Sequence, residues 1–404
     1  MKKALITATV YGFVGSFEKN NIHLLQSLGY EVTVAVNKNI MNRGELRDES
    51  INIVDIPFAR SPFDPVNKKA YQMLLALIMR ENFDLIHTHT PVAGVLTRKA
   101  VNEAVKKGCR RPRVIYTAHG FHFYNGAPLK NNIIYYSIEK SMAKLTDIII
   151  TINHEDYLTA HEKFKPRKEV RYVPGVGIDN AAIREAVKKV SREELRRIYS
   201  VPEDAFLIIS TGELNQNKNH ALVIKALGHI AKNDVNWEEK ETNITKTSDI
   251  KKIYYMIIGE GLEKENLSDL AKSEGISDRV IMPGYIRKPY TLAAAADLFV
   301  FPSKREGLPV SMLEAMSAGM PALASAIRGN RDLMQRAKLA PKTFFAPIFK
   351  PDDSEELAAK IAFLASETDA AKNALSILSK ENVGRAMDFD KEKVIARMKE
   401  IYKD

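Results

Sequence analysis

The sequence predicts an α/β protein made of two doubly wound domains, and two observations carry that prediction. Short runs rich in Ile, Leu and Val alternate with amphipathic helical stretches along the chain. Such runs are typical of strands in a parallel sheet, because helices bury both of its faces. The 404 residues are also long for one domain, so two domains are the natural expectation.

The first half of the chain contains six strand-like runs. They lie at residues 4–10, 31–36, 53–58, 85–89, 114–118 and 148–152. Amphipathic stretches such as 66–80 and 91–107 lie between most of them. Because strands and helices alternate, we expect a parallel sheet covered by helices on both faces.

The second half repeats this alternation. Its strand-like runs lie at residues 206–211, 253–258, 279–283, 298–302, 322–326 and 343–346. Its helical stretches lie at residues 219–232, 263–273, 311–318 and 354–365. The segment 174–180 (PGVGIDN) suits a hinge, so we expect domains at 1–178 and 179–385, with a final helical segment at 386–404. Residues 233–251 are polar and predict an exposed loop.

Composition narrows the class of protein. No apolar run reaches 18 residues, and the N-terminus enters a strand without a signal-peptide pattern, so we expect a cytoplasmic protein that does not span a membrane. The single cysteine, Cys109, excludes an internal disulfide and a cysteine-based metal site. Its surroundings (KKGCRRPR) indicate a surface loop and no catalytic thiol.

The net positive charge of the chain lies entirely in its first half. Residues 1–190 carry 28 Lys and Arg against 18 Asp and Glu, whereas residues 191–404 carry 32 of each. A basic half suggests an anionic ligand or surface. Since no nucleic-acid-binding motif is visible, an anionic membrane surface bearing a lipid-phosphate acceptor is the better expectation. The alternative is that runs such as 106–113 are solvated helix ends.

Two glutamates in SKREGLPVSMLEAMSAGMP are the strongest functional signal. Glu306 follows a strand-like run in a loop rich in Gly and Pro, and Glu314 lies in the helical stretch after it. The first N–H groups of a helix bind anions, and carboxylates accept hydrogen bonds from hydroxyls. This combination fits a nucleotide-sugar. Paired carboxylates also allow a glycosidase, and the plainest alternative is two surface glutamates.

Other candidate residues follow strand ends, where ligands bind in doubly wound sheets. Lys218 lies in the polar loop GELNQNKNHAL and offers a point charge to a diphosphate. His119 ends the strand in VIYTAHGFHFYNGAP, where it can hydrogen-bond a sugar hydroxyl or a developing charge; His122 has no clear role. His87 and His89 share one strand face, but no carboxylate cluster is evident beside them, so we predict no metal site.

Three segments, HGFHF-x-x-GAP, GELNQNKNH and the E-x7-E stretch, closely resemble bacterial family 4 retaining glycosyltransferases of the exopolysaccharide and capsule type. The resemblance runs from the first strand to about residue 364. It implies the GT-B fold, in which two Rossmann-like domains face each other across a cleft and the last helix crosses back to the first domain.

The resemblance also implies roles for particular residues. Glu306 contacts the donor sugar and Glu314 the ribose, while Lys218 and His119 complete the catalytic set. The remaining expected donor contacts are Gly259, Gly261, Tyr285, Ile286, Leu308, Val310, Ser311 and Gly15. Two departures stand out: Glu213 occupies a position where the family usually has Arg, and the paired glycines of the family's first turn are absent around Gly12 and Gly15.

The implied reaction moves a sugar from a UDP-sugar to a polyprenyl-diphosphate-linked saccharide at the inner membrane face. The nucleotide-sugar is the substrate, so neither a cofactor nor a metal ion is expected. Two alternatives stay open at this stage. One is a nucleotide-sugar epimerase on the same fold, and the other is a non-catalytic nucleotide-sugar-binding protein, which the Glu213 departure favours.

Overall fold

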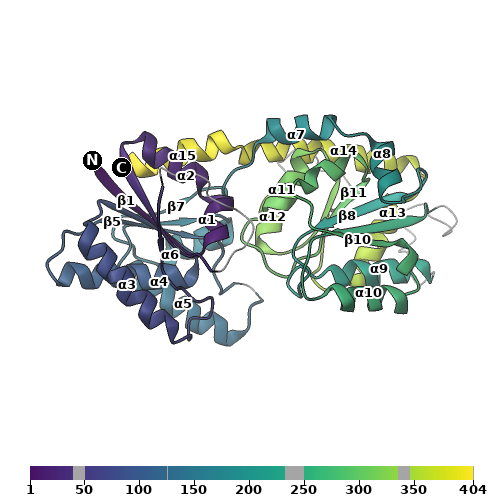
Figure 1. The fold of residues 1–404 in the computed structure, drawn as a ribbon. Coiled ribbons are helices and arrows are strands. Elements are labelled where there is room, and N and C mark those ends of the chain that lie inside the picture. The colour runs from purple at the N-terminus through teal and green to yellow at the C-terminus, as the bar shows by residue number, and fades with distance from the viewer. Residues whose placement is uncertain (40–50, 125, 233–249, 335–345, 404) are drawn as a thin grey trace. The chain divides into compact units, whose positions relative to one another are not determined.

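The computed structural model describes residues 1–39, 51–124, 126–232, 250–334 and 346–403. The chain forms two compact units, unit 1 (Met1–Gly177 with Glu392–Asp404) and unit 2 (Ile178–Lys391) (Figure 1). The predicted loop at 233–251 and the predicted strand at 343–346 lie, apart from residues 250, 251 and 346, outside the described residues.

Unit 1 contains a seven-stranded sheet in the order β3-β2-β1-β4-β5-β6-β7, with every described pair parallel. Its strands are β1 (Lys2–Val10), β2 (Tyr30–Asn37), β3 (Asn52–Asp55), β4 (Leu85–His89), β5 (Arg113–Ala118), β6 (Ile148–Thr151) and β7 (Glu169–Tyr172). All six predicted strands are present. The seventh, β7, was not predicted, because the half-exposed EVRY lacks an apolar run.

Helices cover both faces of this sheet. They are α1 (Tyr11–Phe17), α2 (Lys19–Ser27), α3 (Val66–Glu81), α4 (Pro91–Lys106), α5 (Leu129–Ala143), α6 (His154–Lys163) and α15 (Lys391–Lys403). Side chains of β1 alternate between the faces: Ala4 and Ile6 pack with α1, α2 and α15, whereas Leu5 packs with α3 and α4. No helix in the described ranges is long and apolar enough to cross a membrane.

The final helix, α15, belongs to unit 1 although unit 2 precedes it in the chain (Figure 1). Val394, Met398, Ile401 and Tyr402 form its buried stripe, and their spacing places them on one helix face. This stripe joins the core around β1 and α2. The helical prediction for this segment is confirmed.

Unit 2 contains a six-stranded sheet in the order β10-β9-β8-β11-β12-β13, again with parallel pairs. Its strands are β8 (Phe206–Thr211), β9 (Ile253–Ile258), β10 (Val280–Gly284), β11 (Leu298–Phe301), β12 (Ala322–Ser325) and β13 (Ile348–Phe349). The α-helices are α7 (Asn180–Lys188), α8 (Arg192–Ile198), α9 (His220–Ala231), α10 (Lys264–Ser273), α11 (Val310–Ser317), α12 (Arg328–Met334), α13 (Ser354–Leu364) and α14 (Asp369–Ala386).

Each sheet reverses its strand order once, at the pair where a doubly wound sheet binds its ligand. In unit 1 the reversal lies between β1 and β4, and in unit 2 between β8 and β11. The loops after β8 and β11 carry Lys218 and Glu306, and His119 follows β5, the strand next to β4, so the topology itself brings distant sequence motifs together.

Candidate active site

The loops after β8 and β11 bring Lys218 and Glu306 together in unit 2. The Lys218 Nζ lies 2.6 Å from Glu306 Oε1, and the two side chains are 20% and 15% exposed. The ammonium also lies 4.9 Å from the ring centroid of Phe301, at the end of β11. The structure thus joins two residues that lie 88 positions apart and that were predicted independently.

Asparagines that the sequence analysis missed hold these two loops in place. The side-chain amide of Asn217 donates to the Arg305 carbonyl at 3.0 Å, and the Asn217 carbonyl accepts from the Lys304 N–H at 2.8 Å. The Lys218 N–H donates to Asn215 Oδ1 at 2.9 Å. The N-x-N-K spacing was visible in the sequence, but polar loop residues give no sign of their partners.

Gly259 and Gly261 have a packing role in the structure. A Cβ at Gly259 would lie 1.8 Å from the Gly212 carbonyl oxygen, and one at Gly261 would lie 2.3 Å from that of Leu214. The loop after β9 therefore lies directly against the loop that carries Lys218. Contact of these glycines with a nucleotide remains a prediction.

The first turn of α11 is open to an anion. Pro309, its N-cap residue, has no N–H and provides no side-chain cap, although its carbonyl accepts from the Leu313 N–H at 3.2 Å. Because the first N–H groups of a helix have no partner within it, those of Val310 and Ser311 are available, and Leu308 directly precedes this turn. Diphosphate contact by these three residues stays a prediction.

Glu314 projects from α11 into a largely buried environment. Burial raises the pKa of its carboxyl from 4.5 to about 7. Tyr290 lies close enough for the Glu314 charge to raise the pKa of its phenol, behind the larger effect of burial. The predicted base neighbours Tyr285 and Ile286 follow β10, with Tyr285 47% exposed.

Arg328 is a second cation beside Glu306 that the sequence analysis did not identify. It begins α12, is 6% exposed, and donates from Nε to the Glu306 carbonyl at 3.2 Å. Glu213, where the resembled family usually has Arg, is exposed. The loop that carries Glu306 is therefore supported by a positive charge from another part of unit 2.

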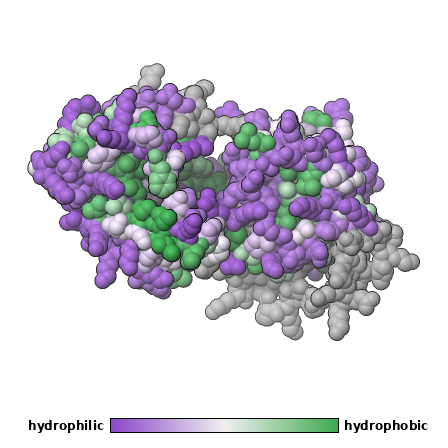
Figure 2. Space-filling model, turned by 90° about the horizontal axis from the view of Figure 1, so that it is seen from below, coloured by the Kyte–Doolittle hydropathy of each residue, from purple (hydrophilic) through white to green (hydrophobic). Residues whose placement is uncertain are grey.

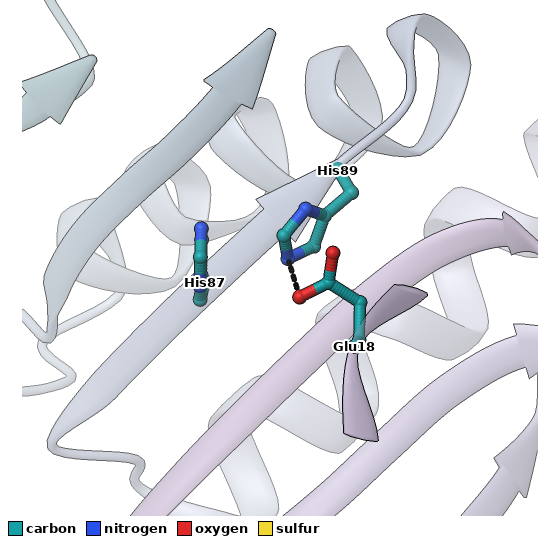
Figure 3. Close-up of side chains that lie close together, drawn as sticks. All are labelled: Glu18, His87 and His89. Carbon is teal, nitrogen blue, oxygen red and sulfur yellow. Dashed lines mark ion pairs between the residues drawn. The ribbon is translucent and has the colours of Figure 1, made fainter. Parts of the chain in front are cut away.

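In unit 1, His119 follows β5 and its side chain is 21% exposed. Its Nε2 lies 3.1 Å from His89 Nδ1 and 3.9 Å from Glu18 Oε1. His89 Nε2 lies 3.3 Å from Glu18 Oε2, within ion-pair distance but without hydrogen-bond geometry (Figure 3). The edge of the Phe13 ring packs against His119, with centroids 4.8 Å apart.

A single carboxylate beside His87 and His89 was missed in the sequence analysis. Glu18 follows α1 and lies 69 and 71 positions before them, so no spacing pattern links the three. The two histidines do share a face, as predicted, with ring centroids 4.1 Å apart. Figure 3 shows the Glu18 carboxylate directed at the His89 ring, with His87 farther along the strand that carries both histidines.

Ligand atoms of Glu18, His87 and His89 lie within 4.8 Å of one another, and this donor set suits a zinc ion. Both nitrogens of His87 are already engaged, however: Nδ1 with Tyr402 OH at 2.7 Å and Nε2 with Thr117 Oγ1 at 2.8 Å. An ion bound through His87 would have to break one of these bonds. The absence of a metal therefore stays a prediction.

Burial keeps this cluster neutral. It raises the pKa of Glu18 from 4.5 to about 8, and it lowers the pKa of His119 to about 4 and that of His87 to about 3. The pKa of His89 is also lowered by burial and by its neighbouring histidines. At neutral pH unit 1 thus holds a protonated acid beside uncharged imidazoles.

The predicted turn around Gly12 and Gly15 is a helix. Strand β1 runs directly into α1, and both glycines are buried within that helix. The paired glycines of the resembled family are absent here, and any ligand contact of Gly15 remains a prediction. His122 is half-buried, with its ring 5.1 Å from that of Tyr135 on α5.

We expect Glu18→Gln to remove a pH dependence of stability. Because the folded state holds a proton on Glu18 up to about pH 8 and the unfolded state loses it near 4.5, stability falls as pH rises between these values. Between about pH 6.5 and 8 the wild type loses about 2 kcal/mol relative to Glu18→Gln, because the contributions of the histidines are the same in both proteins and cancel. Urea unfolding at several pH values measures this loss.

The Gln variant keeps the shape but cannot ionise, so it lacks this loss and keeps only the pH dependence that the buried histidines contribute. Glu31→Gln, at an exposed position on β2, serves as the matched control and should retain the wild-type slope. An unchanged slope in Glu18→Gln would show that Glu18 is ionised in the folded protein.

Comparisons with known proteins agree with this geometry. Residues 191–376 match the family described as glycosyl transferases group 1, and residues 20–179 match glycosyltransferase family 4. A putative glycosyltransferase EpsD of Bacillus subtilis (strain 168) is 33% identical over 401 residues, covering 99% of this chain and 96% of that protein.

A second relative is the Escherichia coli UDP-Gal:alpha-D-GlcNAc-diphosphoundecaprenol alpha-1,3-galactosyltransferase. It is 26% identical over 269 residues, covering 66% of this chain and 64% of that protein. Among solved structures, Anabaena HepE in complex with UDP has a TM-score of 0.69 at 17% identity, with each chain fully covered. Sucrose-phosphate synthase from Thermosynechococcus elongatus has a TM-score of 0.73 at 17% identity, covering 100% of this chain and 98% of that one.

Proposed function

The chain belongs to the family 4 glycosyltransferases of the GT-B fold, and from this premise we propose that it transfers a sugar, with retention, from a UDP-sugar to a lipid-diphosphate-linked saccharide. The observation that carries the proposal is the Lys218–Glu306 pair beside the open first turn of α11. It combines a cation and free N–H groups for a diphosphate with a carboxylate for sugar hydroxyls.

The relatives support the choice of substrates. The E. coli relative is named for a UDP-Gal donor and a diphosphoundecaprenol-linked acceptor. HepE, which shares the fold, is described in complex with UDP. We place the enzyme in extracellular polysaccharide assembly, at the inner face of the plasma membrane, where the basic first half of the chain meets anionic lipid.

In the proposed reaction the acceptor oxygen attacks the donor carbon from the face that the diphosphate leaves. The bond from that carbon to the diphosphate oxygen breaks, the new glycosidic bond forms, and the acceptor proton passes to the departing diphosphate. Lys218 and the N–H groups of Val310 and Ser311 stabilise the charge that develops on the diphosphate. Glu306 positions the sugar, Glu314 the ribose, and His119 a sugar hydroxyl, without a metal ion.

The test is UDP release from a panel of UDP-sugars, with and without a short polyprenyl-diphosphate-linked sugar. Release that requires both one donor and the acceptor supports the transferase. Conversion of the donor without an acceptor supports an epimerase. Donor binding without any turnover supports a non-catalytic binding protein, which the exposed Glu213 keeps in consideration.

We expect donor binding to strengthen as pH rises through about 7. Ionised Glu314 accepts stronger, charge-assisted hydrogen bonds from ribose hydroxyls than the protonated acid does, and burial places its pKa at about 7. The ionised fraction rises about tenfold between pH 6 and 8, so the Kd of the UDP-sugar should fall about tenfold over that range. Calorimetric titration of the donor measures it.

The matched variants are Glu314→Gln, which should bind weakly and without pH dependence, and Glu355→Gln at an exposed position on α13, which should bind like the wild type. If the Kd of the donor depends on pH equally in Glu314→Gln and in the wild type, Glu314 does not contact the donor.

A further inference from the structure

Unit 1 contains a large apolar pocket that the proposed chemistry does not use. It has a volume of about 570 Å³ and lies among α4, α5 and the segment before α3. Its apolar wall includes Phe63, Val92, Val95, Leu96, Ile138 and Met142. We call it the apolar pocket below.

Exposed apolar side chains line the apolar pocket and continue along α5. Phe63 and Ile138 are exposed and line it, and α5, which carries Ile138, has three more exposed large hydrophobic residues. Phe63 is 85% exposed, and on α5 the residues Leu129, Ile133 and Ile134 are 73%, 59% and 48% exposed. Figure 2 shows hydrophobic side chains gathered on this side of unit 1. Contiguous exposed apolar surface of this kind marks a binding surface.

The charges at the apolar pocket favour an anionic ligand. Three charged residues line it: Arg60, Lys99 and Glu139. Glu139 is buried and accepts from Arg98 Nη2 and Tyr116 OH, both at 3.0 Å, so its charge is balanced within the core. Arg60 and Lys99 are exposed, and they leave a net positive charge at the pocket.

The apolar pocket also reaches the strand ends where the ligand of a doubly wound sheet binds. Thr9 near the end of β1, Thr90 after β4 and Gly120 after β5 all line it. His119, the neighbour of Gly120, belongs to the histidine cluster described above. A molecule held in the pocket by an apolar chain would therefore have its polar end beside the candidate catalytic histidine.

The geometry points to the apolar pocket as the binding site for the isoprenoid chain of the lipid acceptor, with Arg60 and Lys99 contacting its diphosphate. The inference rests on the proposed function for the class of acceptor. An apolar wall with a cationic edge matches a molecule that has a long hydrocarbon chain and an anionic end. A neutral protein partner would not explain why the exposed charges at the pocket are both positive.

Farnesyl diphosphate is the first probe, because its binding can be measured by calorimetry without a donor or turnover. We expect it to bind at least about tenfold more tightly than isopentenyl diphosphate, which has the same diphosphate but five carbons. Lys99→Ala should weaken farnesyl diphosphate but not farnesol, which has no phosphate. This measurement can succeed even if transferase activity is absent, so the two proposals fail separately.

The variants Phe63→Asp and Ile138→Asp should each weaken farnesyl diphosphate about tenfold or more. Both positions are exposed, so folding is preserved, and unchanged binding of the UDP-sugar confirms it. Leu158→Asp, at a 54% exposed position on α6 outside the pocket, is the matched control and should bind the probe normally.

Three results would overturn the inference. One is equal affinity for farnesyl and isopentenyl diphosphate. The second is equal loss of binding in the Leu158 control. The third is loss of self-association in Phe63→Asp and Ile138→Asp, measured by analytical ultracentrifugation, with unchanged probe binding; that result would make this surface a contact between copies of the chain.

Discussion

Glu306→Ala is expected to lower the transfer rate about 10- to 150-fold. The change removes the carboxylate proposed to hold the donor sugar and leaves the Lys218 ammonium without its partner at 2.6 Å. A hydrogen bond to a charged group contributes about 1.5–3 kcal/mol, and each 1.36 kcal/mol in the barrier is a factor of ten. Initial rates of acceptor-dependent UDP release measure the effect.

Glu265→Ala provides the control, because that glutamate is exposed on α10 of the same unit. It should retain wild-type activity, and both variants should keep the wild-type unfolding midpoint. Full activity in Glu306→Ala would rule out the site assignment, whatever the activity of the protein.

Arg196→Met is expected to destabilise unit 2 by about 3–5 kcal/mol, because it leaves buried carbonyl oxygens without donors, each at a cost of about 1–3 kcal/mol. Arg196 is fully buried on α8 and donates to Asp297 Oδ2 at 2.8 Å. It also donates to four backbone carbonyls, those of Pro202, Glu203, Ala205 and Ala295. Methionine fills much of the volume but satisfies none of these oxygens.

For a unit of this size the loss lowers the unfolding midpoint by about 10 °C. Scanning calorimetry should show the shift in the transition of unit 2. Arg197→Met, at the exposed next position, should leave the midpoint within about 1 °C because surface changes cost little. Equal midpoints for the two variants would mean that the buried network of Arg196 contributes nothing to stability.

These two residues also show what could be predicted from the sequence. Glu306 was identifiable because the strand, the loop and the helix that place it are consecutive in the chain. Arg196 was not, because REELRRI reads as an exposed helix, and only the folded chain reveals that one of its arginines meets five oxygens.

The same distinction holds for both sheets and for the histidine cluster. Continuous Ile, Leu and Val runs predicted the central strands, whereas the half-exposed β7 had no such signal. His87 and His89 share a face because they are two positions apart in one strand. Glu18 reaches them only because β1 and β4 are neighbours in the sheet, a pairing across 81 positions that periodicity does not encode.

The position of α15 has a consequence for the way this protein is made. A ribosome synthesises residues 1–177 before any of unit 2, yet the core of unit 1 includes four side chains of α15. His87 likewise waits for Tyr402 OH, its partner at 2.7 Å. Unit 2 can therefore complete its core first. Unit 1 leaves an apolar surface uncovered until α15 has been synthesised, and during that time this surface can bind a chaperone.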